Sequence, residues 1–202
     1  MAAFHHVFRF EDSDAEAHYT DYEGDPNNVF EMVGKEVATR APPFETVGEA
    51  KRVWPLKKVV KILSPIPAAA HIYGIGLNYK GHAEEAKLPI PEYPMIFSKP
   101  VDALAGPYED IPIDQECKFM DYEGELCVII GKDCKNISES EDPMDFVLGY
   151  TVANDVSSRY WQMPERAGQA GYAKGFDKFA PIGPILVSPQ ALPDIGSKTM
   201  TT

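Results

Sequence analysis

The stretch that decides the fold reads Asp121-Tyr122-Glu123-Gly124-Glu125-Leu126-Cys127-Val128-Ile129-Ile130-Gly131. Its apolar second half predicts a strand over residues 120–130 that enters the core. Side chains alternate between the two faces of a strand, so Glu123 and Glu125 should point the same way. Two inward carboxylates need a neutralising partner, because burying them unpaired is costly. A divalent cation would serve, although for an isolated Glu-x-Glu pattern a polar outer face on an antiparallel strand is the simpler interpretation.

A third carboxylate ends the next predicted strand, which spans residues 149–156 and contains Gly149-Tyr150-Thr151-Val152-Ala153-Asn154-Asp155. Three carboxylates without a nearby cluster of His or Cys favour a hard, oxygen-binding ion such as Mg²⁺, Mn²⁺ or Ca²⁺ over zinc. For Asp155 alone, a helix cap before the turn that starts at Val156 is an alternative interpretation.

His82 and Glu85 lie three residues apart in a short helix predicted over residues 81–88, which Pro89 and Pro91 would stop. Residues at this spacing share a helix face, so the carboxylate can orient the imidazole and raise its basicity. Such a pair can activate a water molecule. Neighbouring His and Glu residues on a surface are also common, so this pair alone does not define a site.

Two further polar groups follow Asp155. Arg159 and Gln162 lie three residues apart in a predicted helical turn, and Lys174 lies in a loop flanked by glycines. Such a loop can present a lysine to a ligand, although most lysines and arginines are simply solvated. The sequence Gly74-Ile75-Gly76 does not continue as a dinucleotide-binding fingerprint, because Tyr79 occupies the position of the third glycine.

The composition excludes several classes of partner. The chain of 202 residues has 31 acidic and 19 basic residues, a net charge of −12, which would repel nucleic acids and anionic membranes. No apolar run approaches the roughly 20 residues that span a bilayer. The three cysteines form no Cys-x-x-Cys pair and are odd in number, which indicates reduced thiols. Acidic residues follow the first ten residues closely, so we expect no presequence and a cytoplasmic location.

Many short predicted strands and few short helices indicate an α+β architecture that is mainly β. The 18 prolines spread along the chain also favour strands and turns over long helices. Residues 1–66 show short strand patterns, among them 7–11 and 53–56, but no chemical motif. We therefore expect a small β-rich N-terminal region over residues 1–66 and a second domain over residues 67–202, which contains the candidate chemical groups.

Six segments in order resemble the fumarylacetoacetate hydrolase family, over about two thirds of the chain. They are Gly74-Ile75-Gly76-Leu77-Asn78-Tyr79 with His82 and Glu85, Phe97-Ser98-Lys99-Pro100, Asp121-Tyr122-Glu123-Gly124-Glu125-Leu126, Gly149-Tyr150-Thr151-Val152-Ala153-Asn154-Asp155, the stretch from Arg159 to Gln162, and Lys174-Gly175-Phe176-Asp177.

The resemblance implies a mixed β-roll as the catalytic domain, usually assembled as a homodimer. It implies that Glu123, Glu125 and Asp155 hold Mg²⁺ or Mn²⁺. The substrate would be a small 2-oxo acid resembling an acylpyruvate or oxaloacetate, and the reaction would pass through an enolate. Hydrolysis of a carbon–carbon bond is the expected outcome, and decarboxylation or keto–enol tautomerisation would use the same enolate.

The resemblance also assigns roles to the other polar residues. His82 and Glu85 would form the dyad that activates water, and Lys174 would stabilise the developing oxyanion or enolate. The substrate would contact Arg159, Gln162 and Lys99.

The family's catalytic domain continues for several strands that have no counterpart before Thr202, including a Thr-Gly-Thr-Pro-like loop. We therefore expect an incomplete roll in this chain. The alternative to an active enzyme is an impaired homologue that binds metal or pairs with a full-length partner.

Overall fold

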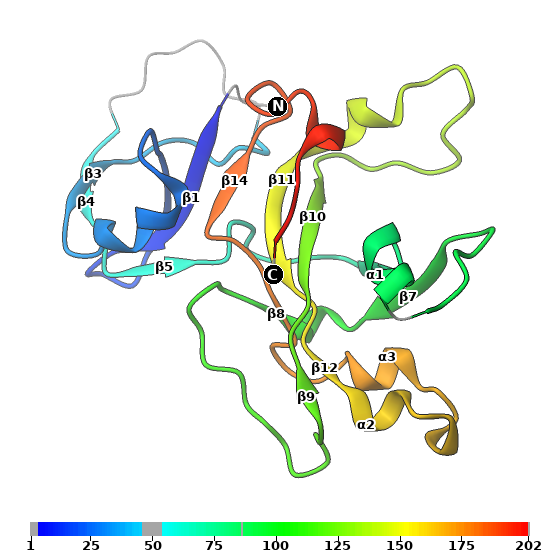
Figure 1. Cartoon of the computed structure of the whole chain (residues 1–202). Helices are drawn as coiled ribbons and strands as arrows, with labels where there is room; N and C mark the ends of the chain where they lie inside the picture. The colour runs from blue at the N-terminus through cyan, green and yellow to red at the C-terminus, as the bar shows by residue number, and fades with distance from the viewer. Residues whose placement is uncertain (1–3, 46–53, 86, 202) are drawn as a thin grey trace.

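A computed structural model describes residues 4–45, 54–85 and 87–201, and its centre is an antiparallel sheet (Figure 1). The N-terminal strands lie on one side of β14, and the long strands β10 and β11 lie on the other. Strand β5 pairs with the second half of β1. In sheet order, the strands are β10 (Gly124–Ile130), β11 (Val147–Asn154), β14 (Ile185–Val187), β1 (His6–Glu11) and β2 (Ala17–Asp21), with β5 (Lys61–Leu63) beside β1.

The core lies on both faces of β1. Val7 packs in one cluster with Leu186 of β14, whereas Phe8 and Phe10 pack in a second cluster with Ile185. Successive residues of a strand face opposite sides, so this alternation requires cover on both faces of the sheet. Strand β1 also pairs with β14, so residues near the two ends of the chain share this core.

Short elements complete the fold, and most of them surround the lower ends of β10 and β11 in Figure 1. The paired strands are β3 (Glu36–Ala38) with β4 (Leu56–Lys58), β6 (Ile72–Gly76) with β7 (Met95–Lys99), β8 (Leu104–Ala105) with β13 (Ala180–Pro181), and β9 (Met120–Asp121) with β12 (Ser157–Ser158). The α-helices are α1 (Lys80–Glu85), α2 (Arg159–Gln162) and α3 (Ala170–Ala173). The 3-10 helices are η1 (Pro26–Met32), η2 (Val101–Ala103), η3 (Pro143–Phe146), η4 (Pro164–Arg166) and η5 (Ile195–Ser197).

The mainly β architecture confirms the predicted fold class, but the strand predicted over residues 120–130 is broken. Residues 120–121 form β9, which pairs with β12, whereas β10 begins at Gly124 and pairs with β11. Between them, the Glu123 N–H donates to the side chain of Asn154, and the Glu123 carbonyl accepts from the Asp155 N–H. The chain changes its pairing partner between β9 and β10, from β12 to β11, and Glu123 lies in this break.

Strand β10 also differs from a strand buried on both faces. It forms an edge of the central sheet, and Leu126, Val128 and Ile130 are exposed on one face. On the other face, Ile129 is buried and Cys127 is half-buried. The apolar run therefore enters the core through alternate residues only.

Other predicted boundaries moved by a few residues. Residues 180–187 contain two short strands, of which β13 pairs with β8 and β14 pairs with β1. The helix predicted over residues 81–88 is shorter, and Lys87 already has a φ of 54°. The strand predicted over residues 53–56 starts at Leu56, and Val53 lies outside the described residues. The domain boundary after residue 66 stays a prediction, and the central sheet contains strands from both sides of it.

Candidate active site

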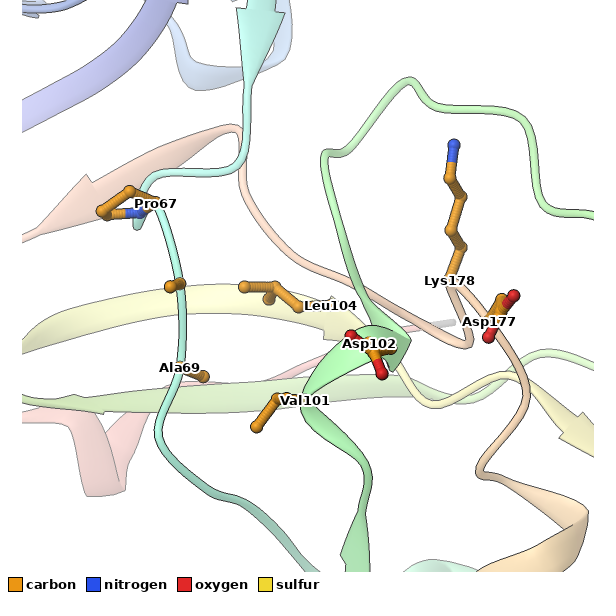
Figure 2. A pocket seen from close by; sticks show the side chains of 8 residues that line it. Pro67, Ala69, Val101, Asp102, Leu104, Asp177 and Lys178 are labelled. Carbon is orange, nitrogen blue, oxygen red and sulfur yellow. The ribbon is translucent and has the colours of Figure 1, made fainter.

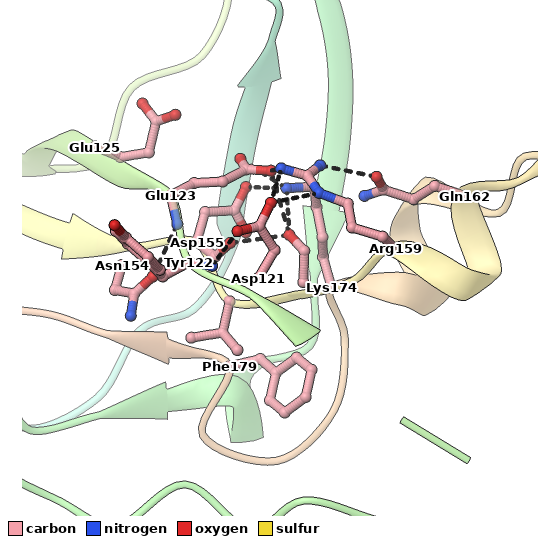
Figure 3. Close-up of polar contacts among 12 residues, drawn as sticks. Asp121, Tyr122, Glu123, Glu125, Asn154, Asp155, Arg159, Gln162, Lys174 and Phe179 are labelled. Atoms are coloured by element: carbon pink, nitrogen blue, oxygen red, sulfur yellow. Dashed lines mark hydrogen bonds and ion pairs between the residues drawn. The ribbon is translucent and has the colours of Figure 1, made fainter. Parts of the chain in front are cut away.

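Four acidic and basic side chains meet where the break before β10 adjoins the end of β11 (Figure 3). Glu123 comes from the break, Asp155 follows β11, Arg159 begins α2 and Lys174 follows α3. The pairing of β9 with β12 brings the start of α2 beside Asp121. The pairing of short strands and turns, rather than one long element, therefore builds this site.

The ammonium of Lys174 lies between two carboxylates. Its Nζ is 2.9 Å from Glu123 Oε2 and 2.7 Å from Asp155 Oδ2, and it donates to Ser157 Oγ at 2.8 Å. Lys174 is only 6% exposed, and Ser157 is fully buried. The ring centroid of Phe97 lies 5.3 Å from the same Nζ. Two half-buried carboxylates thus converge on one buried positive centre, as burial of that charge requires.

Lys99 lies beside the other oxygen of the Asp155 carboxylate. Its Nζ is 2.6 Å from Asp155 Oδ1. The two groups form an ion pair, but their geometry is not that of a hydrogen bond. The same Nζ donates to the carbonyl oxygens of Phe179 at 2.6 Å and Val156 at 3.4 Å. Burial lowers the pKa of Lys99, and the charge of Asp155 opposes that shift. Protein acceptors therefore surround the Lys99 ammonium, although its predicted role is to contact substrate.

Arg159 and Gln162 come together as their spacing predicts. The Arg159 Nη1 donates to Gln162 Oε1 at 2.9 Å, and its Nη2 lies 2.7 Å from Glu123 Oε1. The Nε and Nη2 atoms both approach Asp121 Oδ2 at 2.9 Å. Three side chains therefore hold the guanidinium at the rim of the site.

Glu125 points away from this group (Figure 3), so the three predicted metal ligands are not brought together. Its Oε2 accepts a long hydrogen bond of 3.4 Å from Asn78 Nδ2, and burial raises its pKa. Glu123 precedes the start of β10, so the alternation within one strand does not align it with Glu125. Among the described residues, the acidic group with ligand atoms within 4.8 Å of one another is instead Asp12, Glu16 and His18.

His82 and Glu85 both lie on α1 and both are exposed. Within the described part of the chain, no hydrogen bond or ion pair joins them. The loop before α1 contacts β10, because Asn78 reaches Glu125 and the Leu126 N–H donates to the Tyr79 hydroxyl at 3.4 Å. Helix α1 is thus held beside the candidate site, and the role of the dyad stays a prediction.

The donor chemistry of the site fits a hard divalent cation. Lys174 Nζ stands in for such an ion, since oxygens of Glu123 and Asp155 already converge on it. Mg²⁺ and Mn²⁺ favour this kind of carboxylate ligand. Glu125 lies two residues from Glu123 along the chain, and its side chain points away from this group.

Sequence reasoning missed some of the residues that build this site. Asp121 lies two residues before Glu123, and the period of a strand could have indicated it as a site residue. Ser157 and Asn154 both contact Glu123. The Ser157 hydroxyl donates to Glu123 Oε1 at 3.4 Å, and the Asn154 side-chain oxygen accepts from the Glu123 N–H. Nothing in the local sequence distinguishes these two residues from ordinary polar residues.

A separate cleft of about 590 Å³ contains none of the predicted site residues (Figure 2). Lys178 at its rim forms an ion pair with Glu109 at 2.9 Å. It is lined by residues 67–69, Val101, Asp102, Leu104, Asp177 and Lys178.

Comparison with known proteins agrees with this fold. Residues 71–202 match the family model described as the C-terminal domain of fumarylacetoacetate (FAA) hydrolase. The chain therefore belongs to the fumarylacetoacetate hydrolase family. It is 44% identical over 135 residues to a Xenopus laevis protein named oxaloacetate tautomerase fahd2, mitochondrial. It is 50% identical over 131 residues to the fumarylacetoacetate hydrolase domain-containing protein 2 homolog of Dictyostelium discoideum.

Solved structures show the same relationship. A 2-hydroxyhepta-2,4-diene-1,7-dioate isomerase from Mycobacterium marinum superposes with a TM-score of 0.67 and 33% identity. A 5-carboxymethyl-2-hydroxymuconate delta-isomerase from Mycobacterium smegmatis superposes with a TM-score of 0.69 and 33% identity. Each alignment covers 91% of this chain and 66% of the other chain.

The matches span only part of each relative. The alignments with the two named relatives cover 67% and 64% of this chain, but 42% of each relative. In the described ranges, no helix combines the length and apolar character needed to cross a membrane.

Proposed function

We propose that this chain is a divalent-cation-dependent enzyme that converts small 2-oxo carboxylates through an enolate. The observation that carries this proposal is the convergence of Glu123 and Asp155 on the buried Lys174 ammonium, with Arg159 at the rim. Anionic oxygens arranged around a cation, beside a second cationic group, suit a substrate that chelates metal and carries a carboxylate. The family membership supports the same chemistry.

In this proposal, Glu123 and Asp155 hold Mg²⁺ or Mn²⁺, and Glu125 completes the ligand set. When bound, the cation supplies Lewis-acid stabilisation of negative charge on the substrate oxygens. Lys99 keeps Asp155 oriented, because its Nζ lies 2.6 Å from Asp155 Oδ1. Lys174 turns from the carboxylates toward the substrate and donates to the developing enolate oxygen.

The substrate carboxylate is assigned to Arg159 and Gln162. The side-chain oxygen of Gln162 accepts from Arg159 Nη1, which fixes the plane of the guanidinium. A planar guanidinium with several N–H donors matches a carboxylate well. The net charge of −12 makes such a local cation necessary for an anionic substrate.

Keto–enol tautomerisation of an oxaloacetate-like acid is the first candidate reaction. It moves a proton and requires no attacking water, so it does not depend on a formed dyad of His82 and Glu85. The relative named oxaloacetate tautomerase supports this choice.

Carbon–carbon hydrolysis of an acylpyruvate is the second candidate, favoured by the position of α1. The loop before α1 contacts Glu125 and Leu126 of β10. His82, assisted by Glu85, would deprotonate a water molecule that attacks the distal carbonyl.

Steady-state assays with Mg²⁺ on both substrates separate these candidates. We expect oxaloacetate tautomerisation in the wild type, and if acylpyruvate hydrolysis occurs, His82→Ala should reduce it about 100-fold while tautomerisation persists. Glu84→Ala, at an exposed position of the same helix, is the matched control. Loss of both activities in His82→Ala alone would give His82 a role in enolate formation. Mn²⁺ binding without turnover of either substrate would instead support the non-catalytic alternative.

We also propose a homodimer and a cytoplasmic location. Exposed apolar residues on β10 and β11, Leu126, Val128 and Val152, support a contact with another chain. Three free cysteines, one of them buried, support a reducing compartment. Analytical ultracentrifugation tests the first proposal, and microscopy of the tagged protein in its native cells tests the second.

A further inference from the structure

Asp121 is an acidic residue of the site to which the proposed chemistry gives no role. Its Oδ2 receives both Nε and Nη2 of Arg159 at 2.9 Å, and its Oδ1 accepts the Tyr122 N–H at 3.0 Å. This fork is fixed by the backbone as well, since Ser157 pairs with Asp121 and the Arg159 N–H donates to the Phe119 carbonyl at 3.0 Å.

Arg159 also competes for a proposed metal ligand. Its Nη2 lies 2.7 Å from Glu123 Oε1, while Lys174 occupies Glu123 Oε2 at 2.9 Å. Both oxygens of Glu123 are therefore paired with protein cations. A divalent cation can bind Glu123 only if these contacts weaken, and the released guanidinium then needs another anionic partner.

We propose that Asp121 is a positioning residue that retains Arg159 when Glu123 binds a divalent cation. Asp121 holds the edge of the guanidinium formed by Nε and Nη2, and Gln162 holds Nη1. Arg159 can then release Glu123 without leaving the rim, where its remaining N–H groups face an anionic substrate. This inference rests on the proposed metal at Glu123.

The exposure of the pair argues for this role over a stabilising one. The side chains of Asp121 and Arg159 are 43% and 35% exposed. A pair of that exposure contributes little to the free energy of folding. In contrast, Asp121 competes with Glu123 for Arg159, because the two carboxylates lie only two residues apart along the chain.

The test is calorimetry of Mn²⁺ binding to the full chain, with no other ligand added. We expect Asp121→Asn to weaken Mn²⁺ binding roughly 10-fold, because Arg159 then pairs more fully with Glu123. In an Arg159→Gln background, the same substitution should have no further effect. Glu116→Gln removes an equal charge from the same region without touching Arg159, and it should bind Mn²⁺ as the wild type does.

Unchanged Mn²⁺ binding in Asp121→Asn would overturn the inference. Equal weakening with and without Arg159 would also overturn it, because Asp121 would then act on the cation directly.

A metal-free measurement separates this inference from the proposed function. The Arg159 Nε–H resonance in NMR spectra, assigned by its loss in Arg159→Gln, should be protected from exchange in the wild type and exposed in Asp121→Asn. In the wild type it should persist on saturation with Mg²⁺. Equal protection in Asp121→Asn would refute the retention of Arg159 by Asp121. If the wild type binds no Mn²⁺, the proposed function is refuted. The proposed release of Glu123 by Arg159 is then refuted as well.

Discussion

Lysines neutralise carboxylates in two regions of the molecule. One region contains Asp12, which follows β1, and the other contains Glu123 and Asp155, which lie beside β10 and β11. Lys57 Nζ lies 2.6 Å from Asp12 Oδ2, much as Lys174 Nζ lies 2.7 Å from Asp155 Oδ2. The remaining partners differ. Asp12 Oδ1 accepts the backbone N–H groups of Asp14 and Glu16, so Asp12 holds its own turn together.

Among the described residues, the carboxylates of Glu123 and Asp155 instead have only side-chain partners. Lys174 pairs with both carboxylates, Lys99 pairs with Asp155, and Glu123 accepts from Ser157 and pairs with Arg159. Side-chain partners can exchange for another cation without unfolding a turn, whereas the backbone partners of Asp12 cannot. Although the ligand atoms of Asp12, Glu16 and His18 lie within 4.8 Å of one another, this difference supports the proposal that the divalent cation binds at Glu123 and Asp155.

The largest expected effect tests that placement. Glu123→Gln keeps the shape of the side chain but removes its charge, so Mn²⁺ affinity should fall about 100-fold or more. The midpoint of thermal unfolding should change little. Calorimetry with Mn²⁺ and a thermal melt measure the two quantities.

Asp12→Asn is the matched variant for the other cluster, and we expect the reverse pattern. Lys57 would lose its buried anionic partner, so thermal stability should fall while Mn²⁺ affinity is retained. If Asp12→Asn abolished Mn²⁺ binding and Glu123→Gln did not, the cation would belong to the N-terminal cluster.

The sequence predicted the class of fold because alternation and proline content are local properties. The strands predicted over residues 7–11 and 149–156 correspond to β1 and β11. The break at Glu123 was not predictable, because it depends on β9 pairing with β12 while β10 pairs with β11. These pairings join residues 17 to 38 positions apart and leave no local signal.

The site was predictable to the extent that single motifs carry it. The structure gathers Glu123, Asp155 and Lys174, and places Arg159 beside Gln162, while their roles stay predictions. The expected convergence of Glu125 assumed an unbroken strand, which the structure does not have.

A smaller effect is expected from the lysine that lies between the carboxylates. Lys174→Met removes a cation that competes for Glu123 and Asp155, so apparent Mn²⁺ affinity should rise about 10-fold. Turnover should fall at saturating Mn²⁺, because the enolate loses its donor. Lys178→Met, an equal charge change at a residue paired with Glu109, is the control. Weaker Mn²⁺ binding in Lys174→Met would show that Lys174 supports the ligands rather than competing with a cation.

The smallest expected effect is a difference in acid stability at Asp12. The hydrogen bond from Lys57, followed by the N–H groups of Glu16 and Asp14 and by His18, holds the Asp12 pKa well below its ordinary 3.8. A carboxyl with a lowered pKa in the folded state stabilises the fold above its unfolded pKa, and this contribution is lost as pH falls below it.

Urea unfolding of the wild type should therefore show a loss of stability between about pH 5 and about pH 3 that is smaller in Asp12→Asn, which has no proton to gain. Other carboxylates titrate equally in both proteins, so only the difference between the two profiles reports on Asp12. Parallel profiles would mean that Asp12 has an ordinary pKa in the folded chain. The proposed distinction between a turn-holding carboxylate and the exchangeable carboxylates of the active site would then lose its electrostatic basis.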